Sequence, residues 1–361
     1  MTNRERFRKI MNFEPVDALP LMEIEGYEEG ALARWHAEGL PAGQMPDRAL
    51  DMAMPAHLPI NFFPLPEYPV EIVREDADYI YQRNEFGITT KKPKDTEGHY
   101  SYEGYVDFPV TDMASWMEYE KRLAIGAPGR FGDDWGPETW TKFNNHDRAV
   151  GLVIHPFFFR LGLYALGLEE FLVGFYEQPE LIHRMFEHRA QMTLEILERV
   201  LPHVQVDYAC IAEDFGYKHS THMSPEMYRE FWMPHQPPVI EALKKGGVDT
   251  IVLWSSGDLN PVLPTAIEMG FNCTWPVEEF VGMDVVKLRK EYGQAMRFAG
   301  NIGIRALEDG KDAIDREFDE KILPMVAEGG YIPTLDDQAS PDISWDNYTY
   351  YINRLRELKL S

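Results

Sequence analysis

Short apolar runs alternate with amphipathic helical segments over the second part of the chain, from about residue 149 onward. Six of these runs end in polar residues and are predicted to be strands, and they cover residues 149–156, 206–214, 249–258, 271–278, 296–303 and 331–338. A similar run near the start, ALPLMEI at 18–24, supplies a seventh strand. Because strands alternate with helices, we expect parallel βα units, and because the strands show little polar alternation, we expect both faces of the sheet to be covered.

Seven or eight such units exceed what most open sheets carry, so the pattern predicts an α/β fold of the (β/α)8 type, a TIM barrel. Residues 1–361 are expected to form one domain, in which 146–361 supply the regular units and 1–145 form an elaborated N-terminal part. That part is irregular and rich in proline, methionine and aromatic residues. Within it, residues 71–93 place β-branched and aromatic residues on both sides of a turn with Asn84 and Gly87, which predicts a β-hairpin of two antiparallel strands.

Composition narrows the class of protein. The chain has 361 residues, 44% of them hydrophobic, and a formal charge of −25, which is typical of a globular protein with a sizeable core. The negative charge disfavours nucleic acid and anionic lipid as partners, and weakly disfavours a highly anionic substrate. We find no apolar run of membrane-spanning length and no signal-peptide pattern at the start, so a cytoplasmic location is expected. Cys210 and Cys273 are expected to be buried free thiols.

Nearly every predicted strand ends in a titratable or hydrogen-bonding side chain. In a barrel, the loops that follow the strands build the functional site, so these side chains are expected to line one polar cavity. Each one taken alone also fits a helix cap or a turn, and for Asp258 and Asp284 that structural interpretation is favoured. The strand-end residues are Glu23, Glu25, His155, Glu213, Asp214, Ser255, Ser256, Asp258, Glu278, Asn301, Asp336 and Asp337.

Several passages carry a family resemblance. They are TNRERFRKIMNFEPVDALP at the start, RWHAEGLP at 34–41, and the segments 213–247, 253–272, 277–293 and 329–352. These passages resemble the uroporphyrinogen decarboxylase superfamily, and most closely its branch of corrinoid-linked methyltransferases and uncharacterised relatives. The resemblance implies a (β/α)8 barrel, which agrees with the strand spacing, and a homodimer.

Three departures from the family pattern limit what the resemblance implies. Decarboxylases of the family carry a basic segment near the N-terminus that grips substrate carboxylates, whereas this chain has the acidic PLMEIEGYEEG. Thiol-directed methyltransferases of the superfamily bind zinc through a His-x-Cys pair and a further Cys, whereas Trp254, Ser256 and Asp337 stand at those positions. No Asp-x-His-x-x-Gly passage of a corrinoid-binding domain occurs. A corrinoid would therefore be carried by a separate partner protein, and only a replacement zinc site from His155, Glu213 or Asp337 stays open.

Candidate roles follow from these positions. Glu213 is predicted to be the general acid, with Asp214 as an orienting group, because an apolar strand precedes them and neighbouring strand residues point to opposite sides. His155 is a third catalytic candidate, although a wall residue fits it as well. Arg160 and Arg305 are each able to meet a substrate carboxylate through two parallel hydrogen bonds. The predicted substrate-binding residues are Tyr217, His219, Trp254, Ser256, Asp258, Arg305 and Asp337.

These features favour a methyltransferase component that moves a methyl group from a small methylated substrate, such as a methoxyaromatic compound, to a corrinoid on a separate protein. No tightly bound cofactor is expected on this chain itself. Two alternatives stay open. One is a decarboxylase of the uroporphyrinogen decarboxylase type, a carboxy-lyase, and the other is a non-catalytic binding member of the superfamily.

Overall fold

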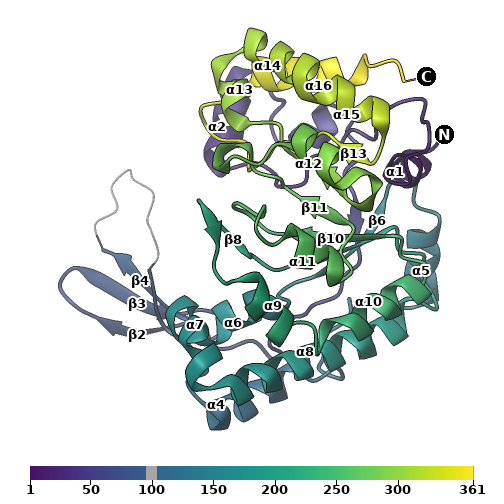
Figure 1. The fold of residues 1–361 in the computed structure, drawn as a ribbon. Helices are drawn as coiled ribbons and strands as arrows, with labels where there is room; N and C mark the ends of the chain where they lie inside the picture. The colour runs from purple at the N-terminus through teal and green to yellow at the C-terminus, as the bar shows by residue number, and fades with distance from the viewer. Residues whose placement is uncertain (95–103, 361) are drawn as a thin grey trace.

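The computed structural model describes residues 1–94 and 104–360 and centres on a curled parallel sheet (Figure 1). Seven strands pair in the order β1-β6-β7-β10-β11-β12-β13. In chain order they are β1 (Ala56–His57), β6 (Val150–Ile154), β7 (Tyr208–Ala212), β10 (Thr250–Trp254), β11 (Cys273–Trp275), β12 (Arg297–Ala299) and β13 (Tyr331–Ile332). Every residue of β7 and β11 is buried. This burial confirms that helices and loops cover both faces of the central strands.

Helices follow the strands and surround the sheet (Figure 1). The segment 168–201 forms two helices that divide at Gln178, because Pro179 lacks an N–H and starts a new helix. The segment 224–247 likewise forms two helices. The helices after β6 are α6 (Phe158–Leu166), α7 (Leu168–Glu177), α8 (Pro179–Val200), α9 (Pro225–Phe231), α10 (Gln236–Lys245), α11 (Leu263–Glu268), α12 (Val285–Tyr292), α13 (Ile304–Asp309), α14 (Lys311–Glu317), α15 (Leu323–Glu328) and α16 (Trp345–Arg356). Short helical turns are η2 (Glu279–Val281), η3 (Gly293–Ala295) and η4 (Phe318–Ile322).

The expected N-terminal strand over 18–24 is wrong, and β1 takes its place as the first strand of the sheet. The segment 21–27 bends at Ile24 and Glu25, and its hydrogen bonds form no regular ladder. The N–H of Ala53 donates to the carbonyl of Leu21 at 2.5 Å, and the N–H of Ala339 donates to the carbonyl of Gly26 at 3.1 Å. Pro20 has no N–H to give to a ladder, which works against regular pairing here. In the part of the chain that the structure describes, no strand ladder joins β13 to β1, and segment 21–27 makes contacts near both edges.

The predicted hairpin is confirmed and extended. Residues 71–93 form three strands rather than two, and a fourth completes an antiparallel sheet in the order β2 (Glu71–Glu75), β3 (Tyr79–Arg83), β4 (Thr89–Pro93), β5 (Gly104–Asp107). The unforeseen turn lies at Asp76, whose carboxylate accepts the N–H groups of Asp78 and Tyr79 at 3.0 and 2.8 Å. Such an Asx turn reverses a chain without glycine. Figure 1 shows this sheet standing out to one side of the domain.

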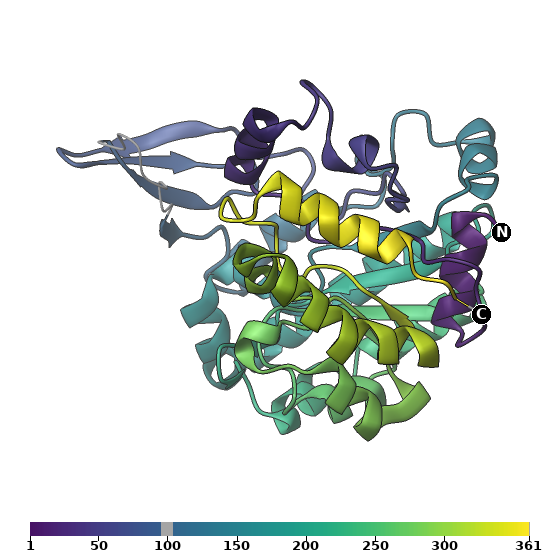
Figure 2. The same cartoon turned by 90° about the horizontal axis from the view of Figure 1, so that it is seen from above.

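The two ends of the chain pack against each other. Trp35 of α2 (Glu29–Glu38) stacks on Tyr348 of α16 with ring centroids 4.6 Å apart, and its indole N–H donates to the carbonyl of Ile343 at 2.8 Å. Figure 2 shows α16 running beside the helices of the α14–α15 region. The other elements of the first part are α1 (Asn3–Met11), α3 (Pro46–Ala49), α4 (Met113–Tyr119), η1 (Glu120–Leu123) and α5 (Pro137–Asn144). Among the described residues, no helix combines the length and apolar character needed to cross a bilayer.

Candidate functional site

A cavity of about 480 Å³ lies between one face of the parallel sheet and the segment 22–25. Val153 with His155, and Tyr208 with Cys210, are pairs two residues apart, so each pair points to the same side of its strand. Aromatic, thioether and carboxyl groups complete the wall. The lining residues are Phe7, Met22, Glu23, Ile24, Glu25, Met54, Pro55, His57, Val153, His155, Tyr208, Cys210, Trp254 and Trp275.

Two glutamates supply the acidic groups of the cavity. Glu23 and Glu25 both line the cavity, as do Met22 and Ile24, because the chain bends at residues 24 and 25. Glu23 is only 1% exposed; its Oε1 accepts the N–H of Leu335 at 3.1 Å, whereas its Oε2 has no hydrogen-bond partner among the described residues. Burial raises the pKa of Glu23 to about 8 and that of Glu25 to about 7. Each carboxyl therefore exists in both protonation states near neutral pH.

Two imidazoles face the same space. His57 Nε2 is 2.8 Å from the hydroxyl of Tyr208, and His155 Nε2 is buried without a partner in the described structure. Burial lowers the pKa of His155 to about 3 and also lowers the pKa of His57. Both rings are therefore neutral at pH 7. Within residues 1–94 and 104–360, no arginine or lysine lines the cavity.

A chain of contacts connects the cavity to Asp214. The indole N–H of Trp254 donates to Glu25 Oε1 at 2.9 Å. The guanidinium of Arg160 lies 4.6 Å from the centroid of the Trp254 ring and is paired with Asp214 at 3.1 Å. Burial raises the pKa of Asp214, although Arg160 opposes this shift. Asp214 and Arg160 are therefore connected to the cavity indirectly, through the Trp254 indole that hydrogen-bonds to Glu25.

Glu213 points to the helices rather than into the cavity. Tyr208 and Cys210 line the cavity, so strand alternation puts Glu213 on the opposite side. Its two oxygens accept hydrogen bonds from the indole of Trp232 at 2.7 Å and from the N–H of Phe159 at 2.6 Å. The side chain is fully buried, and burial raises its pKa to about 8. The role of Glu213 as the general acid stays a prediction, but this carboxyl does not line the cavity.

The other predicted site residues lie outside the cavity lining. Tyr217 in β8 (Gly216–Tyr217) is 62% exposed, and His219 is exposed in the turn before β9 (Ser220–Thr221). Asp258 forms a turn by accepting hydrogen bonds from Asn260, as its structural interpretation predicted. Arg305 is exposed with its guanidinium 4.2 Å from the centroid of the Phe280 ring.

Ser256 and Asp337 lie closer to the cavity carboxyls. The side chain of Ser256 hydrogen-bonds to Glu278 and lowers its pKa, whereas burial raises that pKa more strongly. Asp337 is exposed, and its negative charge adds to that of Glu278 in raising the pKa of Glu25. Glu25, Glu278 and Asp337 therefore form an acidic group, with Arg160 as the opposing charge.

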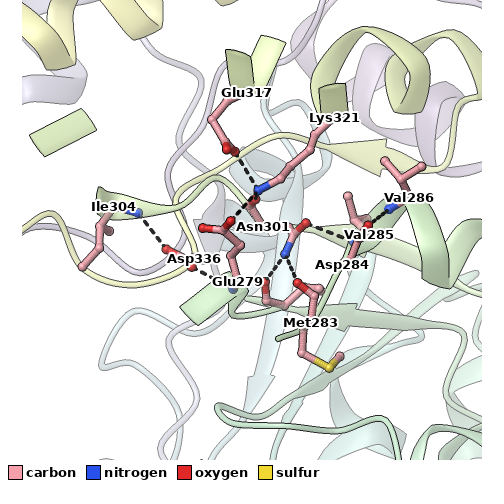
Figure 3. A network of polar contacts seen from close by, with 12 residues as sticks. Glu279, Met283, Asp284, Val285, Val286, Asn301, Ile304, Glu317, Lys321 and Asp336 are labelled. Atoms are coloured by element: carbon pink, nitrogen blue, oxygen red, sulfur yellow. Dashed lines mark hydrogen bonds and ion pairs between the residues drawn. The ribbon is translucent and has the colours of Figure 1, made fainter. Parts of the chain in front are cut away.

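Asn301 holds loops together rather than lining the cavity (Figure 3). Its Oδ1 accepts the N–H of Val285 at 3.0 Å, and its Nδ2 donates to the carbonyls of Val277 and Met283 at 2.9 Å. The residue has a φ of 65°, a left-handed conformation that asparagine tolerates better than most residues. This strand-end polar residue is therefore structural.

Asp336 extends the same network (Figure 3). Its carboxylate accepts the N–H groups of Glu279 at 2.9 Å and Ile304 at 3.0 Å, and Lys321 joins Glu279 to Glu317 by ion pairs at 3.3 and 2.9 Å. Burial raises the pKa of Asp336 to about 6. The loops after β11, β12 and β13 are thereby fixed to one another.

Sequence reasoning missed two features of the cavity. His57 lies in the irregular part of the chain, within AMPAHLPINFF, where no periodic pattern marked a strand. Tyr208 stands at the start of β7, whereas candidates were sought at strand ends. The sequence did mark the cavity through Glu23 and Glu25, which were predicted to be acidic strand-end residues. No role was predicted for either.

The residues do not fit a zinc ion. Trp254 has no atom that ligates zinc, and Ser256 hydrogen-bonds to Glu278. The replacement site is not assembled either, because Glu213 points away from the cavity that His155 lines. In the described residues, no group of three or more histidine, cysteine, aspartate or glutamate side chains is placed to hold a metal ion. Cys210 and Cys273 are buried free thiols, as expected.

A curled parallel sheet with helices around it and a cavity built from its strands defines the class, an α/β fold. The family model for uroporphyrinogen decarboxylase (URO-D) matches residues 151–358. This match covers more than half of the chain, so the chain belongs to the URO-D family.

Two known proteins are similar to this chain, one in sequence and one in structure. A uroporphyrinogen decarboxylase from Chlorobium phaeobacteroides is 25% identical over 189 residues, and the match spans half of this chain and half of that curated relative. A methyltransferase from Methanosarcina mazei has a similar structure, with a TM-score of 0.62, 16% identity and coverage of 99% of both chains. At this level of sequence identity, the structural similarity supports the fold alone.

Proposed function

We propose that this protein is a methyltransferase component that binds a small methylated substrate in the cavity and passes its methyl group to a corrinoid carried by a separate protein. The observation that carries the proposal is the placement of Glu23 and Glu25 in a cavity that no arginine or lysine lines among the described residues. A porphyrinogen with many carboxylates needs cations at its site, and like charges in a confined site are costly. The cavity therefore favours methyl transfer over decarboxylation.

The bond between the methyl carbon and its heteroatom breaks in this reaction, and the electron pair stays with the heteroatom. A low-valent corrinoid on the partner supplies the nucleophile that takes the methyl group. The residues of this chain bind the substrate, exclude water and stabilise the charge that develops on the leaving atom. A neutral carboxyl of Glu23 or Glu25 suits a leaving oxygen, as in a methoxyaromatic substrate, whereas an ionised carboxyl suits a cation.

His155, Asp214 and Glu213 have different places in this proposal. His155 is a neutral ring with a free Nε2, which is available to hydrogen-bond to the substrate as donor or acceptor according to its tautomer. Asp214 is a positioning residue that acts through Arg160 and Trp254 on Glu25. Glu213 is a positioning residue that ties β7 to Trp232 and Phe159. We also infer that the segment 21–27 closes the sheet into a barrel in place of an eighth strand.

The decisive experiment follows methyl transfer directly. The purified protein is mixed with a methylated donor and a corrinoid-binding protein held in its low-valent state, and the change in cobalt absorbance is recorded. Donors are a set of methoxybenzoates, methylamines and quaternary ammonium compounds, and parallel samples contain uroporphyrinogen. Methyl transfer supports the proposal. Decarboxylation of uroporphyrinogen overturns it, and tight binding of a small ligand without turnover favours the non-catalytic binding member.

A further inference from the structure

The cavity has an unbalanced charge when its carboxyls ionise. Burial and the negative charges of Glu25 and Asp336 raise the pKa of Glu23, and among the described residues no arginine or lysine lines the cavity beside it. Burial, Asp337 and Glu278 raise the pKa of Glu25, and the positive charge of Arg160 lowers it. Arg160 is already paired with Asp214. The protein therefore places more negative than positive charge around this space.

The remaining titratable groups at the cavity do not supply the missing positive charge. His57 and His155 are neutral at pH 7, because burial lowers the pKa of both rings. Burial raises the pKa of the Cys210 thiol and of the Tyr208 hydroxyl, so both stay protonated and uncharged. Either protonation of the carboxyls or a cationic ligand therefore balances the negative charge.

Aromatic rings lie next to these carboxyls. Phe7 and Trp275 flank Tyr208, with ring centroids 5.4 Å from it in both cases, and Trp254 donates its N–H to Glu25. Faces of such rings attract cations, and quaternary ammonium groups are bound in proteins by aromatic cages. The Oε2 atom of Glu23, buried and without a partner in the described chain, is available to the same ligand.

We propose that the cavity takes a methylated cation, with its quaternary ammonium or sulfonium group against the aromatic rings and Glu23 and Glu25 as the balancing charges. This inference rests on the proposed function and names its substrate class. Transfer of a methyl group from such a cation breaks the bond between carbon and nitrogen or sulfur. The electron pair stays on the heteroatom, which leaves as a neutral amine or thioether, so no proton donor is required.

The test compares choline with 3,3-dimethylbutan-1-ol, which has the same shape without the charge. Both are titrated calorimetrically into the full-length protein from pH 6 to pH 9, a range in which choline keeps its charge. A carboxyl that titrates near pH 7 goes from about one tenth ionised at pH 6 to almost fully ionised at pH 9, so choline should bind about tenfold more tightly at pH 9. The neutral alcohol should change by less than about twofold. At pH 7, choline binding should release protons, seen as a dependence of the measured heat on the buffer.

Matched variants locate the effect. Glu25→Gln keeps an oxygen for the indole of Trp254 and Glu23→Gln keeps an oxygen for the N–H of Leu335, so both should fold. Each should weaken choline binding at pH 9 by about tenfold or more and flatten its pH dependence. Glu198→Gln, an exposed change on α8 outside the cavity lining, should leave both unchanged. Circular dichroism confirms folding for each variant.

Outcomes for this inference and for the proposed function are separate. If choline binds no more tightly than the neutral alcohol at pH 9, the inference is overturned. Methyl transfer from a methoxyaromatic donor in the same preparation would then leave the proposed function intact. If choline binds with the expected pH dependence but no donor yields methyl transfer to a corrinoid, the cation site is supported and the proposed function fails.

Discussion

At the scale of a single residue, the hydrogen bond from the indole N–H of Trp254 favours the ionised form of Glu25. This hydrogen bond lowers the pKa of Glu25 against the stronger opposing effect of burial. Trp254→Phe keeps an aromatic ring but removes the donor, so the pKa of Glu25 should rise by about 1 unit above its present value. Titration of ¹³C-labelled glutamate carboxyls by NMR measures the shift. Trp140→Phe, on α5 and outside the cavity, is the matched control, and an unshifted Glu25 in Trp254→Phe would contradict the geometry.

Glu213 is a residue whose two hydrogen bonds predict a stability effect. In Glu213→Gln, one side-chain end becomes an N–H₂ group that faces an N–H donor of either Trp232 or Phe159. Leaving one buried donor unpaired should lower the free energy of unfolding by about 1–3 kcal/mol, measured by urea denaturation. The same variant tests the acid role expected from the sequence. If Glu213 is the general acid, kcat should fall by about 10²–10⁴-fold. If Glu213 only positions other residues, the pH dependence of kcat should stay unchanged.

The β8–β9 hairpin meets the loop after β10 through two glycines. A Cβ on Gly216 would lie 2.1 Å from the carbonyl oxygen of Ser256. Gly257, which packs against the same hairpin, has a φ of 85°. Gly216→Ala should push the hairpin off the loop and destabilise the protein by about 1–3 kcal/mol. Gly126→Ala, where a Cβ meets nothing within 4 Å, should change stability by less than about 0.5 kcal/mol. Equal melting temperatures for the two variants would refute the close approach.

Arg130 joins two irregular segments of the N-terminal part. It is 1% exposed and donates to the carbonyls of Asn61 and Phe63 at 2.7 Å and to that of Arg122 at 3.1 Å. Arg130→Met removes these donors and leaves buried carbonyls unpaired, so we expect a loss of about 3–5 kcal/mol in the free energy of unfolding. The exposed Arg229→Met, which breaks a surface ion pair with Glu268, should cost less than about 1 kcal/mol.

The whole molecule should become less stable above neutral pH. Burial raises the pKa of Glu23 and Glu213 to about 8 and of Glu25 to about 7, whereas these groups ionise near pH 4 in the unfolded chain. Between pH 6.5 and 8 the native state therefore binds more protons than the unfolded state, and stability falls as pH rises, by up to about 1.4 kcal/mol per pH unit for each group. Below pH 6.5, buried neutral histidines such as His155 act in the opposite direction.

Urea denaturation between pH 5 and pH 8.5 measures this profile. Glu23→Gln should reduce the slope above pH 6.5, because it removes one of the titrating carboxyls, while Glu198→Gln should leave the slope unchanged. A free energy of unfolding that rises from pH 6.5 to 8 would show that these carboxyls are ionised in the native state. The homodimer and the cytoplasmic location expected from the sequence stay predictions. Light scattering at micromolar concentration decides the first.

Periodicity alone determined most of the sheet. Six strands after residue 149 lie where the apolar runs predicted them, because a strand buried on both faces needs a continuous apolar run. Local chemistry also revealed the turn at Asp258. The N-terminal strand was predicted wrongly and the turn at Asp76 was not predicted, since one depends on which neighbours segment 21–27 meets and the other on a single side-chain hydrogen bond.

The orientation of side chains at the site was decided by tertiary structure. The sequence by itself determined that Glu213 and Asp214 point to different sides, but not which of them meets the helices. That choice depends on the register of β7 against β6 and β10, which puts Tyr208 and Cys210 in the cavity. The cavity also joins residues from distant parts of the chain, with Glu25 held by Trp254 and His57 by Tyr208. Contacts over such sequence separations leave no local pattern, because only the packing of the folded chain creates them.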